Sequence, residues 1–158
     1  MNDARKQYTT ENGVLPSFSY SFQSGEFAVR DALARFIDEL SPLDLDVEEK
    51  GTIELVLAEA LNNIVEHAYP APEPAGQINV SCVHGKDGLH VEITDTGYAM
   101  PDGRLPVGEL SPIDGGVDDL PEGGFGWFLI QSLAKDVTYQ RRGNVNELNL
   151  RLAIGTTH

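Results

Sequence analysis

The sequence predicts an α+β fold, a layered sandwich of helices on a sheet, from two observations. Apolar residues recur at helical spacing in two long blocks, residues 24–40 and 46–67. Short alternating runs come in pairs around glycine-containing turns, as in antiparallel hairpins. The 158 residues suit one domain, so we expect an N-terminal tail over residues 1–16 and a single domain over residues 17–158.

Each of the first elements carries a local signal. Residues 17–23 alternate aromatic side chains with serine, which is the period of a strand. We expect Ser24 to cap the helix that follows and Pro42 to stop it. Asp46 is expected to open the second helix, which runs to about His67.

The second half of the chain combines hairpins with one long loop. Residues 95–124 show little periodicity and are rich in glycine, proline and acidic residues. A loop near 30 residues is uncommon inside a compact domain and is typically functional. The remaining elements are expected as strands over residues 77–83 and 89–94, a helix over 125–133, and strands over 137–140 and 148–153.

Charge and composition exclude several classes of protein. Eleven Lys and Arg against 25 Asp and Glu give a net charge of −14. Such a surface repels nucleic acid and anionic membranes, although solubility alone explains the acidity equally well. The single cysteine, Cys82, excludes an intramolecular disulfide. Because no stretch is typical of a signal peptide or a membrane span, we expect a cytoplasmic protein.

A polar stripe runs along the second predicted helix. Glu59, Asn63 and Glu66 fall on the face opposite the apolar residues, with Asn62 beside them. Asparagine is a poor helix former, so its place here needs a reason. An amide oxygen directed at Mg²⁺ is one such reason, and a carboxylate one turn earlier could then act as a base. A solvated helix face is the alternative.

Two glycine-containing segments are further candidates. Asp95 ends a strand shortly before Gly97. Its carboxylate could accept a hydrogen bond from the exocyclic amine of a ligand, while the glycine backbone approaches the ligand ring closely. A simple turn is the alternative. Gly124 and Gly126 open a helix, where backbone N–H groups and the helix dipole favour an anion; an ordinary helix start is the alternative.

These features, in this order and spacing, resemble the GHKL ATPase superfamily, or Bergerat fold. Glu59 to Asn63 is similar to its N box, Asp95 to Gly97 to its first glycine box, and Gly124 to Gly126 to its second. The segments E-A-x-x-N, E-H-A-Y and G-G-x-G-x-x-L-I most resemble bacterial anti-sigma-factor serine/threonine kinases. The resemblance implies a two-layer α/β sandwich with helices on one face of a mixed, mostly antiparallel sheet.

The resemblance also implies roles for single residues. Asn63 would hold Mg²⁺ on the phosphates of ATP, and Glu59 would be the general base for a serine hydroxyl. Asp95 would bond the adenine amine, with Gly97 leaving room for the ring. Gly124 and Gly126 would cradle phosphates, and residues 98–122 would form a lid over ATP. Arg104, the only Lys or Arg between Lys86 and Lys135, is the candidate lid contact to phosphate; a surface loop arginine is the alternative.

The implied partners are an anti-sigma-factor antagonist as protein substrate, a sigma factor, and a second copy of the chain in a homodimer. The last strands lack the threonine of the family and carry Asn146 and Asn149 instead, and the expected lid is acidic. These departures motivate an alternative function, a nucleotide-binding switch that sequesters a partner without transferring phosphate. His67 could contact phosphate or Glu66, or be structural.

Overall fold

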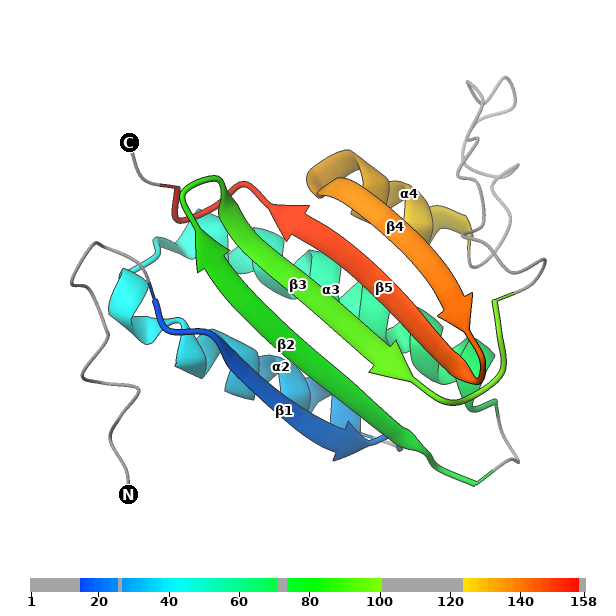
Figure 1. Cartoon of the computed structure of the whole chain (residues 1–158). Helices are drawn as coiled ribbons and strands as arrows, with labels where there is room; N and C mark the ends of the chain where they lie inside the picture. Colours follow the sequence, from blue (N-terminus) through cyan, green and yellow to red (C-terminus); the bar gives the residue numbers. More distant parts are fainter. Residues whose placement is uncertain (1–14, 26, 71–73, 101–123, 157–158) are drawn as a thin grey trace.

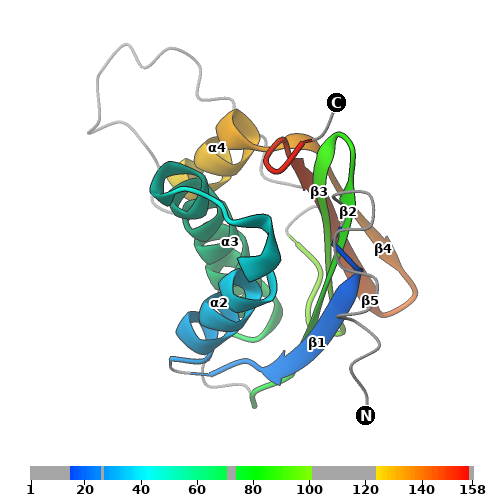
Figure 2. The ribbon, with the colours of Figure 1, turned by 90° about the vertical axis from the view of Figure 1, so that its left-hand side faces the viewer.

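The described part of the chain forms one five-stranded sheet, and its helices lie against one face of this sheet (Figures 1 and 2). The computed structural model describes residues 15–25, 27–70, 74–100 and 124–156. The sheet order is β1-β2-β3-β5-β4. The strands are β1 (Phe18–Gln23), β2 (Gln77–Gly85), β3 (Gly88–Asp95), β4 (Lys135–Arg142) and β5 (Val145–Leu152); the helices are α2 (Ala28–Glu39), the 3₁₀ turn η1 (Ser41–Leu43), α3 (Val47–Ala68) and α4 (Gly124–Leu133).

The layered α+β sandwich is therefore confirmed. All four described strand pairs are antiparallel, whereas the family resemblance implied a mixed sheet. In Figure 2 the described helices lie on one side of the sheet, and none of them covers the other face. Alternation along the strands directs apolar side chains toward the helices, so the core lies between the two layers.

α3 is the central helix of its layer and has the clearest start signal. The side chain of Asp46 accepts a hydrogen bond from the Glu49 N–H, and the Glu49 side chain accepts one from the Asp46 N–H. This reciprocal capping box satisfies N–H groups that have no partner within the helix. The apolar face predicted for α3 is buried as expected: Ile53, Leu57, Ala60, Leu61, Ile64 and Ala68.

Two expectations about local structure are wrong. Ser24 does not cap α2, because its hydroxyl accepts a hydrogen bond from the Gly76 N–H instead, at 2.9 Å. The Ser24 hydroxyl thus joins the end of β1 to the segment that enters β2. The last two strands also differ from the predicted residues 137–140 and 148–153. β4 is longer at both ends, where charged residues hide the alternation, and β5 begins three residues earlier, at Val145, and ends at Leu152.

The single cysteine lies in the core, on the buried face of β2. Cys82 is 1% exposed, and burial raises the pKa of its thiol to about 12, so it is a packing residue. None of the described helices combines the length and apolar character needed to cross a membrane.

His84 on β2 joins the two ends of the described chain. Its Nδ1 accepts a hydrogen bond from the Leu15 N–H at 2.8 Å, and its Nε2 lies 2.6 Å from the Gly155 carbonyl oxygen. Because Leu15 can only donate and Gly155 can only accept, the ring proton is on Nε2. The buried imidazole therefore satisfies one backbone donor and one backbone acceptor.

We predict that His84→Ala lowers the free energy of unfolding by about 2–4 kcal/mol, because two backbone groups lose their partner. Urea unfolding followed by circular dichroism measures the change. His90→Ala is the matched control: within the described part of the chain the exposed His90 ring pairs with exposed Asp87 alone, so we expect a much smaller loss than for His84→Ala. Equal losses in the two variants would contradict the role assigned to His84.

Candidate functional site

Three neighbouring strands bring one polar residue each to the same end of the sheet. Asp95, the last residue of β3, is the register partner of Asn146 on β5. Asn146 is in turn the register partner of Arg141 on β4. Asp95 and Asn146 are each 3% exposed and continue the inward-facing rows that carry the core. Polar side chains on the buried face of a sheet need hydrogen-bond partners, and here Asn146 donates to Asp95.

The carboxylate of Asp95 is held through one of its two oxygens. Oδ1 accepts hydrogen bonds from the Asn146 amide at 2.7 Å and from the Gly97 N–H at 2.8 Å. Oδ2 has no hydrogen-bond partner among the described residues. Burial raises the pKa of Asp95, while the bonds from Asn146 and Gly97 and the charge of Arg141 oppose that shift. The site thus presents one fixed carboxylate oxygen with free acceptor capacity.

The turn that follows Asp95 is anchored on both sides. The Tyr98 N–H donates to the Ala68 carbonyl at the end of α3, at 3.0 Å. The Thr96 N–H donates to the Tyr69 hydroxyl at 3.1 Å, and the Met100 N–H donates to the Tyr139 hydroxyl at 2.9 Å. These bonds tie the turn to α3 and to β4, so the backbone beside Asp95 is preorganised.

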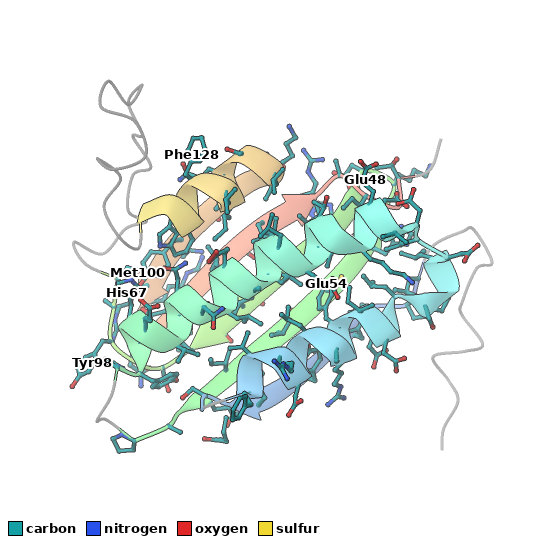
Figure 3. The ribbon with its side chains drawn as sticks, turned by 180° about the vertical axis from the view of Figure 1, so that it is seen from behind. Glu48, Glu54, His67, Tyr98, Met100 and Phe128 are labelled. Carbon is teal, nitrogen blue, oxygen red and sulfur yellow. The ribbon has the colours of Figure 1, made fainter. Side chains whose placement is uncertain are left out.

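A small pocket lies beside Asp95, between the C-terminal end of α3 and the sheet. Figure 3 shows His67 and Met100 together near that end of α3, while Tyr98 points away from the body of the molecule. Tyr98 is 57% exposed, so its ring is accessible. The pocket is lined by Ile64, His67, Ala68, Ile93, Asp95, Tyr98, Met100, Tyr139, Asn146 and Leu148. It combines an apolar lining with a buried carboxylate, and its volume of about 10 Å³ has room for about one water molecule.

Asn63 and Glu59 lie one turn apart on α3. The Asn63 amide nitrogen donates to the Glu59 carbonyl at 2.6 Å, which fixes the orientation of the amide. Its Oδ1 has no hydrogen-bond partner among the described residues. Glu59 is half-buried. A fixed amide oxygen beside a partly solvated carboxylate is the donor chemistry that a hard cation accepts.

The polar stripe lies only in part where the helical period places it. Asn62 and Glu66 are exposed, but Asn63 is 5% exposed. α3 packs against both α2 and α4 in its layer, so more of its circumference is covered than one apolar stripe accounts for.

The second glycine segment begins α4, as predicted. Gly124 and Gly126 are in the first turn of this helix, where N–H groups lack partners within the helix. Trp127 follows and is fully buried, and its indole N–H has no hydrogen-bond partner among the described residues. Arg104 and residues 101–122 of the expected lid lie outside the described residues.

Sequence reasoning did not find all the residues that the structure brings to Asp95. His67, for which the sequence leaves open a contact to phosphate, a contact to Glu66 or a structural role, lines the pocket beside Asp95. The motif spacing does not indicate Tyr139 or Arg141, and it marks Asn146 only as a departure from the family pattern. No short-range pattern marks them, because their position depends on the register of β5 against β3 and β4. Three polar or aromatic residues at inward positions near strand ends were the available signal.

Gly97 is required by contact with α3. A Cβ at this position would lie 2.2 Å from the Ala68 carbonyl oxygen and 2.7 Å from the Ala68 Cβ. We predict that Gly97→Ala displaces the turn, breaks the Tyr98–Ala68 bond and lowers the free energy of unfolding by about 1–3 kcal/mol. Gly51→Ala is the control: nothing lies within 4 Å, and the helix should gain up to about 1 kcal/mol. Thermal unfolding of both variants tests whether Gly97→Ala loses stability while Gly51→Ala gains it.

Comparisons with known proteins identify the family of the chain. The chain matches the histidine kinase-like ATPase domain family over residues 25–152. It is 32% identical over 97 residues to the serine-protein kinase RsbW of Bacillus licheniformis, which covers 60% of this chain and 58% of that protein. It is 32% identical over 102 residues to the serine-protein kinase RsbW of Staphylococcus aureus, which covers 63% of this chain and 62% of that protein. The matches thus span about three fifths of these curated relatives.

A solved structure shares the fold. The crystal structure of RsbU and RsbW domains from Mycobacterium tuberculosis superposes with a TM-score of 0.58 at 18% identity, and the match covers 87% of this chain and 32% of that one. The family match extends over most of the chain, including α3, the Asp95 turn and the start of α4. The chain therefore belongs to the histidine kinase-like ATPase domain family, and serine-protein kinases named RsbW are among its relatives.

Proposed function

We propose that this chain is an ATP-dependent protein serine kinase that acts as an anti-sigma factor. Its protein substrate would be a serine of an anti-sigma-factor antagonist, and its second partner a sigma factor that it sequesters. The observation that carries the proposal is the Asp95 carboxylate, held through Oδ1 in an otherwise mostly apolar pocket with Oδ2 available. A fixed acceptor of this kind suits the exocyclic amine of adenine.

Mg²⁺ fits the chemistry of α3, with Asn63 as its protein ligand. No group of three or more His, Cys, Asp or Glu side chains among the described residues is arranged to hold a metal by itself. A cation here would thus depend on the phosphates and on water as well as on Asn63, which is how Mg²⁺ is usually bound beside nucleotides. When bound, it would neutralise phosphate charge in a protein whose net charge is already −14.

The side chains of this chain would supply positioning and proton transfer. Phosphoryl transfer needs alignment and charge neutralisation more than covalent help. Glu59, one turn before Asn63, would accept the proton of the attacking serine hydroxyl. The N–H groups of the first turn of α4, with Gly124 and Gly126, would cradle the phosphates. Gly97 and the anchored turn would keep the base against Asp95, and Arg104 would contact phosphate.

The proposed partners follow from the relatives and from charge. The two RsbW proteins are named serine-protein kinases, which supports a protein substrate. The acidic surface favours a basic docking region on a partner and disfavours direct contact with nucleic acid. We further propose that the chain works as a homodimer in the cytoplasm, that residues 17–158 act as one unit, and that residues 98–122 form the lid.

The sole tryptophan gives a direct test of nucleotide binding. Trp127 is fully buried in the first half of α4, so nucleotide at the start of this helix should change its fluorescence. We expect a saturable change on titration with ATP and Mg²⁺, and phosphate transfer to a co-encoded antagonist. Binding without transfer to any such antagonist would favour the nucleotide-binding switch. Absence of both a fluorescence change and a thermal shift at millimolar ATP would contradict either function.

A further inference from the structure

We propose that Asn146 is the positioning residue of the nucleotide site: it orients the Asp95 carboxylate and joins it to the Gly97–Met100 turn. The inference rests on the proposed function, because it assumes that Asp95 reads the base. It adds a residue that neither the motif spacing nor the comparisons assign. It also assigns a task to Tyr139 and Arg141, which act on the site through Asn146.

The Asn146 side chain has no spare hydrogen-bonding capacity. Its amide nitrogen donates to Asp95 Oδ1 at 2.7 Å and to the Tyr98 carbonyl at 2.9 Å, with the Gly97 carbonyl at 3.3 Å. Its oxygen accepts from the Tyr139 hydroxyl at 2.8 Å and from Arg141 Nη1 at 2.9 Å. A primary amide has two N–H donors and two acceptor lone pairs, so all are in use. Asn146 therefore acts through Asp95 rather than on the base.

The direction of these hydrogen bonds is fixed by a backbone group. The Met100 N–H can only donate, so the Tyr139 oxygen accepts from it and the Tyr139 proton goes to Asn146 Oδ1. Arg141 also can only donate, and its Nη1 binds both Asn146 Oδ1 and the Gly97 carbonyl. The amide nitrogen of Asn146 must then face Asp95. The turn and the carboxylate are thereby held as one hydrogen-bonded unit.

This arrangement leaves one of the two carboxylate oxygens of Asp95 available to the base. Oδ1 of Asp95 is engaged by Asn146 and Gly97, and Oδ2 has no partner among the described residues. Loss of the Asn146 donor would free the carboxylate to rotate and would release the turn from β5. Both effects weaken binding, because the ligand would have to order groups that are now ordered in advance.

Asn146→Asp tests the role with a readout that a purely structural role would not move. The variant places a second carboxylate against Asp95, and two carboxyl groups at this distance share a proton. The ionisable groups around the pair are His67 from α3, Tyr98 from the turn, and Tyr139 and Arg141 from β4. We expect Kd for ATP with Mg²⁺ to rise about 10–100-fold at pH 8. At pH 6 the shared proton restores a hydrogen-bond donor between the two carboxyl groups, so Kd should be about 5-fold or more lower than at pH 8.

The wild-type chain and Asn144→Asp are the controls for pH and charge. Asn144 is exposed in the turn between β4 and β5, so the same substitution there should leave Kd within about 2-fold of wild type at both pH values. Wild-type affinity measured at both pH values is the reference for pH effects that do not come from residue 146. An Asn146→Asp variant with wild-type affinity, or with a loss that is the same at pH 6 and pH 8, would overturn the inference.

Tyr139→Phe keeps the inference testable if Asn146→Asp does not fold. This variant removes the hydroxyl between Met100 and Asn146 but keeps the Asp95–Asn146 pair, so we expect Kd to rise about 3–10-fold with no dependence on pH. Unchanged affinity would contradict the network. A wild-type chain that binds no nucleotide would instead refute the proposed function, so the two failures are distinguishable.

Discussion

Asp95→Asn should remove ATP binding while leaving the fold intact. The substitution is isosteric, and an amide oxygen at the Oδ1 position can still accept from Asn146 and from the Gly97 N–H. An amide nitrogen then replaces Oδ2, so a donor would face the donor amine of adenine. We expect Kd for ATP with Mg²⁺ to rise by about 100-fold or more, because a buried polar group and its ligand are both left unpaired. Isothermal calorimetry measures the loss.

The same variant should be at least as stable as the wild type. Burial raises the pKa of Asp95 above its ordinary value of 3.8, so the folded state favours the neutral carboxyl group. A raised folded pKa means that the wild type loses stability as pH rises from the unfolded value through the folded one. Asparagine does not titrate, so the difference in unfolding free energy should grow in favour of Asp95→Asn over this window and persist at pH 7.

Urea unfolding between pH 4 and pH 7 checks this second result. Asp87→Asn is a suitable control, because Asp87 is exposed and its pKa is lowered chiefly by the hydrogen bond with His90. Its lowered pKa adds stability that is lost only as pH falls below the ordinary value of 3.8, so Asp87→Asn should show little change relative to the wild type between pH 4 and pH 7. A large loss of stability in Asp95→Asn across the whole range would show that the carboxylate is kept for the fold and would remove the main support for a nucleotide site.

The fold could be predicted because its signals are local. The capping residue Asp46, the helical period of α3 and the turn between β2 and β3 each involve a few neighbouring residues. The same is true of Asp95 and Gly97, which mark the end of β3. A glycine after a strand predicts a turn, although the contact with Ala68 that requires it here comes from a residue 29 positions earlier.

The surroundings of Asp95 could not be predicted in the same way. Asn146 meets Asp95 because β5 pairs with β3 in one register, and this pairing joins strands that are not consecutive in the chain. A shift of one residue would turn Asn146 to the other face. The burial of Asn63 has a similar origin, because it depends on packing of α3 against its neighbours rather than on the period of one helix.

Glu59 and Asn63 should separate catalysis from binding. We expect Glu59→Gln to lower the rate of phosphate transfer by about 100-fold or more while Kd for ATP changes little, since only the proton acceptor is lost. Asn63→Ala should weaken binding of ATP in the presence of Mg²⁺ by about 10-fold or more and lower transfer as well. Alanine is the better helix former, so α3 should remain folded. Transfer to the antagonist and Trp127 fluorescence measure the two effects.

Neighbouring residues on the same helix provide matched controls. Glu66→Gln and Asn62→Ala carry the same substitutions at exposed positions, and both should keep wild-type transfer and binding. Full transfer by Glu59→Gln would refute its assignment as the base without affecting the nucleotide site. Equal binding by Asn63→Ala with and without Mg²⁺ would place the cation elsewhere. If Glu59→Gln and Glu66→Gln lose transfer to the same degree, the acidic face of α3 acts by general electrostatics, and α3 carries no specific catalytic carboxylate.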